Sequence, residues 1–125
     1  MARATQEAPR KQIHFFADVD LYKRINTARM SESFPDSMRV NQFVKMCVEN
    51  GVADVSKGKW TKPPASPPKA DPKTKRYSIH FFADMVFYRK IHVALMVFPE
   101  PPRLKNFIIW CLERGIDDIY KRAAA

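Results

Sequence analysis

The sequence contains few of the residues that would support covalent chemistry or a disulfide framework. Its 125 residues include only two cysteines and three glycines. Two cysteines without a signal-peptide pattern favour a reducing, cytoplasmic setting. No apolar run approaches the roughly 18 residues of a membrane span. There is no Ser/His/Asp grouping, no glycine-rich phosphate loop and no repeated carboxylate pair. We therefore expect neither an enzyme nor a membrane-spanning chain, and we expect no cofactor.

An internal repeat dominates what is present. Residues 13–18 and 79–84 both read IHFFAD, and weaker matches extend the similarity over about 44 residues in each copy. One copy is too small to bury an adequate core alone, so we expect the two copies to share one core. The predicted organisation is a disordered basic arm over 1–9, unit 1 over 10–55, a Pro/Lys-rich linker over 56–75, unit 2 over 76–122 and a tail over 123–125.

Positive charge is concentrated ahead of the two IHFFAD segments. The chain carries a net charge of +9, of which residues 56–76 contribute +6 and residues 1–11 contribute +2. Charge placed beside a specific element suggests a polyanionic partner that meets that element. Ordinary solubilising charge on disordered segments is the alternative interpretation.

Copy 1 predicts a strand followed by two helices. Apolar and polar residues alternate from Arg10 onward, which is typical of a strand. Asp18 is a suitable N-cap for a helix over residues 19–30. An apolar stripe from about Val40 then predicts a second helix that ends at Gly51, a favourable residue after a helix end.

Copy 2 repeats this plan with a strand over residues 76–83, the cap Asp84 and a helix over 85–96. Its second helix is predicted to end at Gly115. In both copies the apolar strand face should lie against the helices. The residues on that face are Ile13, Phe15, Ala17, Ile79, Phe81 and Ala83.

One strand, a capped helix, a turn and a second amphipathic helix in about 44 residues resemble a ribbon-helix-helix unit of the MetJ/Arc-like superfamily. Such units act as pairs whose strands form one antiparallel ribbon. The resemblance implies a mainly α fold with a short two-stranded antiparallel β-ribbon, in which both units form an intramolecular pseudo-dimer. It also implies sequence-specific binding of double-stranded DNA by a transcriptional repressor or regulator. The alternatives are an accessory protein of plasmid or mobile-element transfer and an antitoxin-like protein-interaction module.

The resemblance implies that the outward ribbon face enters the major groove. Glutamine can read adenine, serine is permissive, an apolar ring can contact the thymine methyl group, and histidine could donate to guanine acceptors. The residues predicted to read bases are Gln12, His14, Phe16, Ser78, His80 and Phe82.

Phosphate contacts are expected at the start of each second helix, where free N–H groups attract anions, and on the basic residues beside the strands. Arg10 and Arg76 share the outward direction and could reach either guanine or phosphate. Simple surface charge is the alternative interpretation. The predicted phosphate-binding residues are Arg10, Lys11, Arg39, Asn41, Lys75, Arg76, Arg103 and Lys105.

Several of these residues have a structural interpretation as well. A strand bend could turn Phe16 and Phe82 onto the helix ends. His14 and His80 lack acidic or thiolate neighbours, so no metal site is expected. The cysteines, at positions 47 and 111, lie in the apolar stripes and are expected to pack as small core residues.

Copy 2 also carries apolar residues where copy 1 has polar ones. Such a change at four positions suggests a contact surface for self-association or for a protein partner. The alternative is that the linker, with Trp60, folds over this side. The four residues are Val86, Val93, Leu95 and Ile109, which replace Asp20, Thr27, Arg29 and Lys45.

Overall fold

A computed structural model describes residues 10–31, 38–60 and 75–124, with side chains as far as 121. This part of the chain contains four helices and one two-stranded antiparallel sheet, so the prediction of a mainly α fold with a short β-ribbon is confirmed. The expected arm over 1–9 and linker residues 61–74 lie outside the described residues. The elements are β1 (Arg10–Asp18), α1 (Val19–Arg29), α2 (Val40–Ser56), β2 (Arg76–Asp84), α3 (Met85–Leu95) and α4 (Leu104–Ala124).

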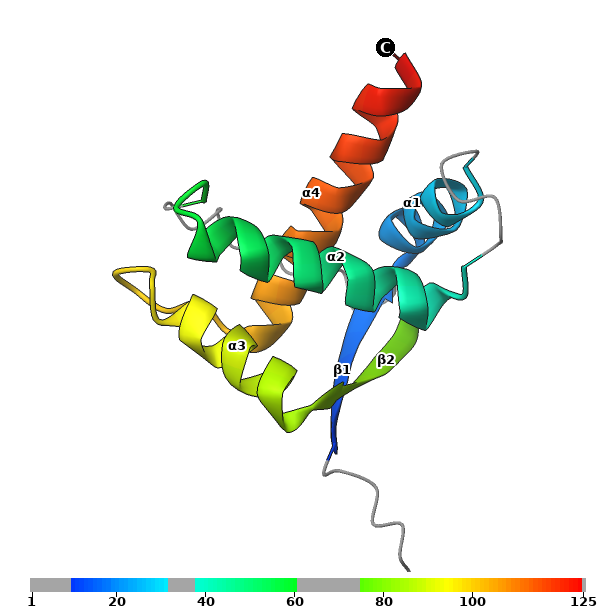
Figure 1. Cartoon of the computed structure of the whole chain (residues 1–125). Coiled ribbons are helices and arrows are strands. Elements are labelled where there is room, and N and C mark those ends of the chain that lie inside the picture. The colour runs from blue at the N-terminus through cyan, green and yellow to red at the C-terminus, as the bar shows by residue number, and fades with distance from the viewer. Residues whose placement is uncertain (1–9, 32–37, 61–74, 125) are drawn as a thin grey trace, which may run out of the picture.

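The two strands pair with each other, although α1 and α2 separate them in the chain (Figure 1). His14 lies opposite His80, its counterpart in the repeat, and Arg10 and Asp18 lie opposite Asp84 and Arg76. The register is therefore symmetric about the two histidines. Each strand satisfies the backbone edge that the other would otherwise leave unpaired.

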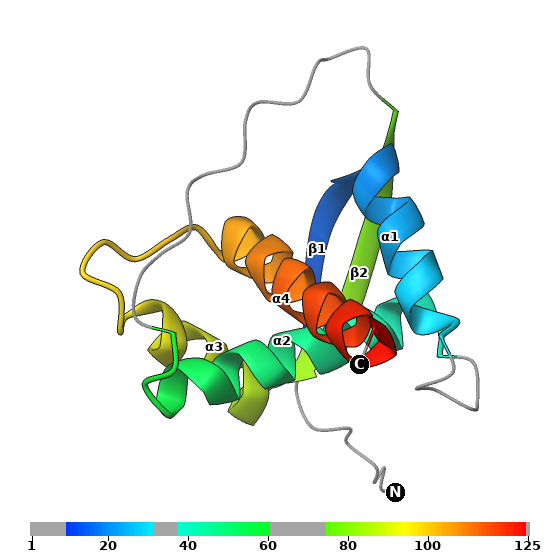
Figure 2. The same ribbon diagram turned by 90° about the horizontal axis from the view of Figure 1, so that it is seen from above.

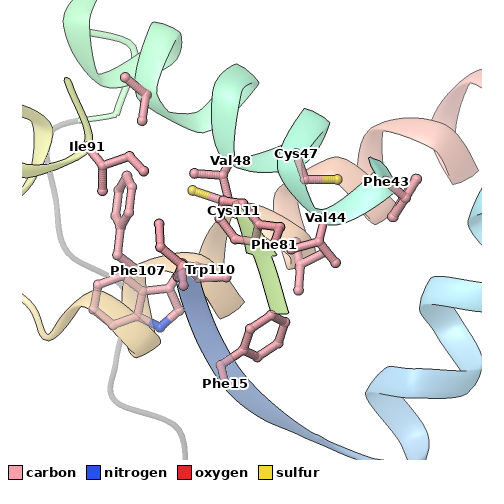
Figure 3. Close-up of a cluster of buried hydrophobic side chains, with 14 of the residues drawn as sticks. Phe15, Phe43, Val44, Cys47, Val48, Phe81, Ile91, Phe107, Trp110 and Cys111 are labelled. Atoms are coloured by element: carbon pink, nitrogen blue, oxygen red, sulfur yellow. The ribbon is translucent and has the colours of Figure 1, made fainter. Parts of the chain in front are cut away.

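The inward face of the ribbon forms part of the core, as the alternation predicts. Phe15 and Phe81 point from their strands into the cluster of buried side chains that α2 and α4 also contribute to (Figure 3). None of the six predicted inward residues is more than 4 % exposed. Burying two phenylalanines and their aliphatic neighbours on one face requires both copies, because each strand supplies only half of that face.

The first helix of each copy begins where its aspartate predicts. The backbone N–H of Leu21 donates to Asp18 Oδ1 over 2.7 Å, and that of Phe87 donates to Asp84 Oδ1 over 2.8 Å. These bonds satisfy N–H groups that a helix start leaves free. Each strand therefore passes directly into its helix. In both views α1 and α3 lie on opposite sides of the crossed helices α2 and α4 (Figures 1 and 2).

The predicted ends of the second helices, at Gly51 and Gly115, are wrong. Helix α2 continues to Ser56 and α4 to Ala124, which also takes two residues of the expected tail into the helix. A Cβ at Gly51 would lie 2.3 Å from Cys111 Sγ, and a Cβ at Gly115 would lie 2.5 Å from Cys47 Sγ. The glycines let α2 and α4 approach closely at their crossing, so their role is packing between the copies.

Ion pairs connect the copies at the edge of this crossing. Arg24 of α1 lies 2.8 Å from the Glu113 carboxylate on α4, and Arg114 of α4 lies 3.0 Å from the Asp54 carboxylate on α2. The side chains involved are 29–40 % exposed. Such pairs contribute about 0–1 kcal/mol each, so the apolar core supplies most of the association. No helix among the described residues is long and apolar enough to cross a membrane.

Candidate nucleic-acid interface

The outward face of the ribbon brings together all six residues that the sequence predicts as base readers. Gln12, Ser78 and His80 are exposed, and His14 is half-buried. Phe16 and Phe82 are 46 % and 45 % exposed. The alternative that a bend turns both phenylalanines onto the helix ends is therefore wrong, since burial alternates from Gln12 to Asp18 in β1 and from Arg76 to Asp84 in β2.

Aromatic contacts order the middle of this face. The ring centroids of His14 and Phe16 are 4.8 Å apart, and those of His80 and Phe82 are 6.2 Å apart, both edge to face. His14 Nε2 is also hydrogen-bonded to Ser78 Oγ. The residue equivalent to Ser78 in copy 1 is Gln12, and among the described residues no corresponding bond joins Gln12 to His80. The two halves of the face therefore differ near their centre.

Arginines lie over the two phenylalanines. The Arg10 Cζ is 4.9 Å from the centroid of the Phe82 ring, and the Arg76 Cζ is 5.2 Å from that of Phe16. Each contact joins the two strands. A cation over an exposed ring is stabilised by about 0.5–1 kcal/mol. The face thus combines aromatic surface with a positive group near each end.

Two grooves flank the ribbon, and the repeat relates them. Groove A has a volume of about 510 Å³ and groove B about 220 Å³. Each groove runs between one strand and the start of the second helix of the other copy. Groove A is lined by Lys11, Gln12, Ile13, His14, Tyr88, Arg103, Leu104 and Lys105, and groove B by Tyr22, Val40, Asn41, Ser78, Ile79 and His80.

Groove A is the more cationic of the two. Lys11, Arg103 and Lys105 all line it and are all exposed. The Lys11 Nζ lies 5.9 Å from the centroid of the Tyr88 ring, so its ammonium group is held near the groove wall. Three cations, one on β1 and two at the start of α4, suit an anionic strand that passes along this side of the ribbon.

Groove B differs in its chemistry. Asn41 stands where groove A has Lys105, and Tyr77 stands where copy 1 has Lys11. The rings of Tyr77 and Tyr22 are stacked with centroids 4.0 Å apart, and the Lys75 Nζ lies 5.2 Å from the Tyr77 centroid. The Asn41 side-chain oxygen accepts a hydrogen bond from the Gln42 N–H, which occupies one of the backbone donors at this helix start.

Arg39, another predicted phosphate-binding residue, directly precedes α2. Its side chain is exposed at the start of α2, while its backbone N–H donates to the Gln42 side chain. All eight predicted residues are exposed. Arg10, Lys11 and Arg76 lie on the strands and Lys75 directly precedes β2, while the other four stand at the starts of α2 and α4. The sequence prediction omits Tyr22, Tyr77 and Tyr88. Tyr22 and Tyr88 occupy equivalent positions in the two copies, and this recurrence in the sequence could have indicated a shared role for them.

The cysteines lie in the core, as predicted. Cys47 and Cys111 are both free and 1 % exposed. Burial is the main cause that raises the pKa of Cys47 to about 12, and the nearby Asp118 carboxylate raises it further. Burial also raises the pKa of Cys111. Both thiols are thus protonated and weakly nucleophilic. The described residues contain no group of three or more His, Cys, Asp or Glu side chains that could hold a metal ion.

The expected contact surface on copy 2 is only partly exposed. Val86 and Val93 are 63 % and 67 % exposed, but Leu95 is only 7 % exposed and Ile109 is partly buried against the core. The prediction of an exposed surface at Leu95 is therefore wrong. Trp60 stacks on Phe107 and meets the edge of Phe98, so it covers another part of copy 2 and leaves the two valines uncovered by the described residues.

Comparison with known proteins adds no family to these observations: no family model, curated protein or solved structure matches this chain.

Proposed function

We propose that this chain is a tandem ribbon-helix-helix pseudo-dimer that binds duplex DNA with sequence specificity. The ribbon would enter the major groove, which is about 12 Å wide and admits a two-stranded β-ribbon. The single observation that carries the proposal is the register in which His14 faces His80. That pairing supports the proposal because it presents side chains of both copies on one exposed face.

The charges around this face support a nucleic acid as the partner. Polar groups that can read base edges occupy the ribbon, while cations stand in the grooves beside it. This division matches duplex recognition, in which phosphate contacts position a protein and base contacts give specificity. The exposed cations that flank the ribbon are Lys11, Arg39, Lys75, Arg103 and Lys105.

Salt dependence tests the proposal. If these five cations contact phosphates, the binding constant for duplex DNA should fall with a log–log slope of roughly −4.5, or about 500-fold between about 50 and 200 mM salt. Fluorescence anisotropy with a labelled random-sequence duplex measures this slope. The proposal is wrong if the folded protein binds no duplex at the lower salt concentration.

Matched substitutions distinguish phosphate contacts from base reading. Lys105→Asn gives groove A the residue of groove B, and should lower the affinity for every duplex and reduce the slope by about one. Gln12→Ala should instead weaken discrimination at one base position by about 1–3 kcal/mol. The reverse exchange, Asn41→Lys, should strengthen binding to all sequences. If Gln12→Ala weakens binding to random and selected duplexes equally, this division is wrong.

We propose transcriptional regulation as the biological role. A site recovered by selection from random duplexes can be placed between a promoter and a reporter gene. Expression should fall when the protein is supplied, and Gln12→Ala should restore it. Binding to the site without any change in expression would instead favour an accessory role in DNA transfer.

A further inference from the structure

Two arginine–phenylalanine pairs occupy equivalent places on the ribbon face. Arg10 lies over Phe82, and the equivalent residues of the other copy form the second pair, in which Arg76 lies over Phe16. In the register Phe82 lies opposite Gln12. Each arginine therefore reaches diagonally across the ribbon to a ring on the other strand. All four side chains are exposed.

We propose that Arg10 and Arg76 read guanine, and that Phe82 and Phe16 are positioning residues that hold the two guanidinium groups. This inference rests on the proposed binding of duplex DNA. It assigns base recognition to two arginines that their charge alone would assign to phosphate. It assigns the phenylalanines a role in aiming an arginine, in place of direct contact with thymine.

The chemistry of guanidinium supports this assignment. The group is planar and presents its N–H donors at its edge, so a ring that packs on its flat face does not compete with a base for those donors. Guanine offers two acceptors, O6 and N7, in the major groove, and arginine bonds both at once. A guanidinium already held on a ring loses less freedom when it makes this contact. An ammonium group lacks the fork and would gain little from such a platform.

The direction of the arginines supports it further. Arg10 and Arg76 lie on the outward side of their strands and are not among the residues that line groove A or groove B, whereas Lys11 and Lys105 line groove A. Groove cations suit the sugar–phosphate strands at the groove edges. In the proposed complex, side chains on the outward face of the ribbon would point toward the floor of the major groove, where base edges lie.

The spacing of the pairs predicts the spacing of the guanines. Phe16 and the residue opposite Phe82, Gln12, are four positions apart in β1. A strand rises about 3.4 Å per residue, so the two platforms are roughly 14 Å apart along the ribbon. Base pairs follow one another at about 3.4 Å. We therefore expect two guanines on opposite DNA strands, about four base-pair steps apart and symmetric about the centre of the site.

The test uses the full-length protein, a duplex with the selected site, and the same duplex with 7-deazaguanine at one guanine, which lacks the N7 acceptor. Arg10→Lys keeps the charge but loses the fork. It should lose about 5- to 150-fold in affinity for the selected site. Its binding to random duplex and the salt slope should stay unchanged. The 7-deazaguanine duplex should weaken binding of the unmodified protein and have little further effect on Arg10→Lys.

A double-mutant comparison tests the positioning role. Phe82→Leu keeps an apolar side chain but removes the ring, and should lower preference for the same guanine as Arg10→Lys does. Combining these two changes should cost little more than Arg10→Lys alone. Combining Arg10→Lys with Phe16→Leu should be additive, because Phe16 holds the other arginine. Phe82 is 45 % exposed, and unchanged thermal unfolding should confirm that Phe82→Leu folds.

The inference is overturned if Arg10→Lys weakens all duplexes equally, or if Phe82→Leu leaves guanine preference intact. Either result would leave duplex binding by the unmodified protein standing. Failure of the unmodified protein to bind any duplex would instead remove the proposed function on which the inference rests.

Discussion

Replacing Gly51 with alanine tests the contact through which the two copies share a core. Alanine is favoured over glycine by about 1 kcal/mol inside a helix, and at an uncrowded site it would stabilise the protein. Here the new Cβ would lie 2.3 Å from Cys111 Sγ, far inside the normal contact distance of about 3.5–4.0 Å between carbon atoms. Overpacking of this kind costs about 1–3 kcal/mol.

The clash should therefore outweigh the gain in helix propensity. At the upper end of the overpacking range the net loss is about 2 kcal/mol, which corresponds to a fall in Tm of roughly 8 °C for a chain of 125 residues. Thermal and urea unfolding followed by circular dichroism measure this loss. The exchange in the other copy, Gly115→Ala against Cys47, should behave in the same way because its Cβ would lie 2.5 Å from Sγ.

Removing the facing sulfur provides the decisive comparison. In a Cys111→Ala background the closest remaining atom is the Cβ at 3.1 Å, so Gly51→Ala should become neutral or stabilising by up to about 1 kcal/mol. In a Cys47→Ala background the loss should persist, since Cys47 does not face Gly51. The reasoning is refuted if Gly51→Ala stabilises the unmodified protein, or if both backgrounds show the same loss.

Three further outcomes are expected. Fragments 1–56 and 70–125, expressed separately, should not fold as monomers, and a cooperatively unfolding monomer in sedimentation and calorimetry would contradict the shared core. The pKa of Cys47 is raised to about 12 in the folded state. Below the ordinary thiol pKa of about 8.5, Cys47 is protonated in both the folded and the unfolded chain, so its titration should not reduce the free energy of unfolding there. Above that pH the unfolded thiol ionises while the folded thiol stays protonated, so the free energy of unfolding should fall as pH rises toward 12. Urea midpoints should therefore fall less over this pH range in Cys47→Ala. Finally, Val86→Asp with Val93→Thr, the copy 1 residues, should reduce self-association and cooperativity on DNA without loss of stability, whereas sedimentation of the unmodified protein as a monomer at high concentration would remove this expectation.

Local features of the fold could be predicted because their causes are local. Alternation over the IHFFAD segments sets which strand residues face inward, and the aspartates after them start the helices because their side chains reach N–H groups three residues ahead. The outward positions of Phe16 and Phe82 follow from the same alternation. The repeat itself predicted that the strands would pair, since one strand and one apolar face cannot be satisfied within a single copy.

Only the tertiary structure decided what depends on contacts between distant residues. Gly51 and Gly115 read as helix ends because glycine is common there, but in the folded chain each one faces a cysteine of the other copy. Leu95 looked like a surface residue beside Val93, yet it is buried. The placement of Arg10 over Phe82, and the difference between grooves A and B, depend on which residues the register and the helix packing bring together. The local sequence sets which way a side chain points, whereas its neighbours come from parts of the chain that meet only after folding.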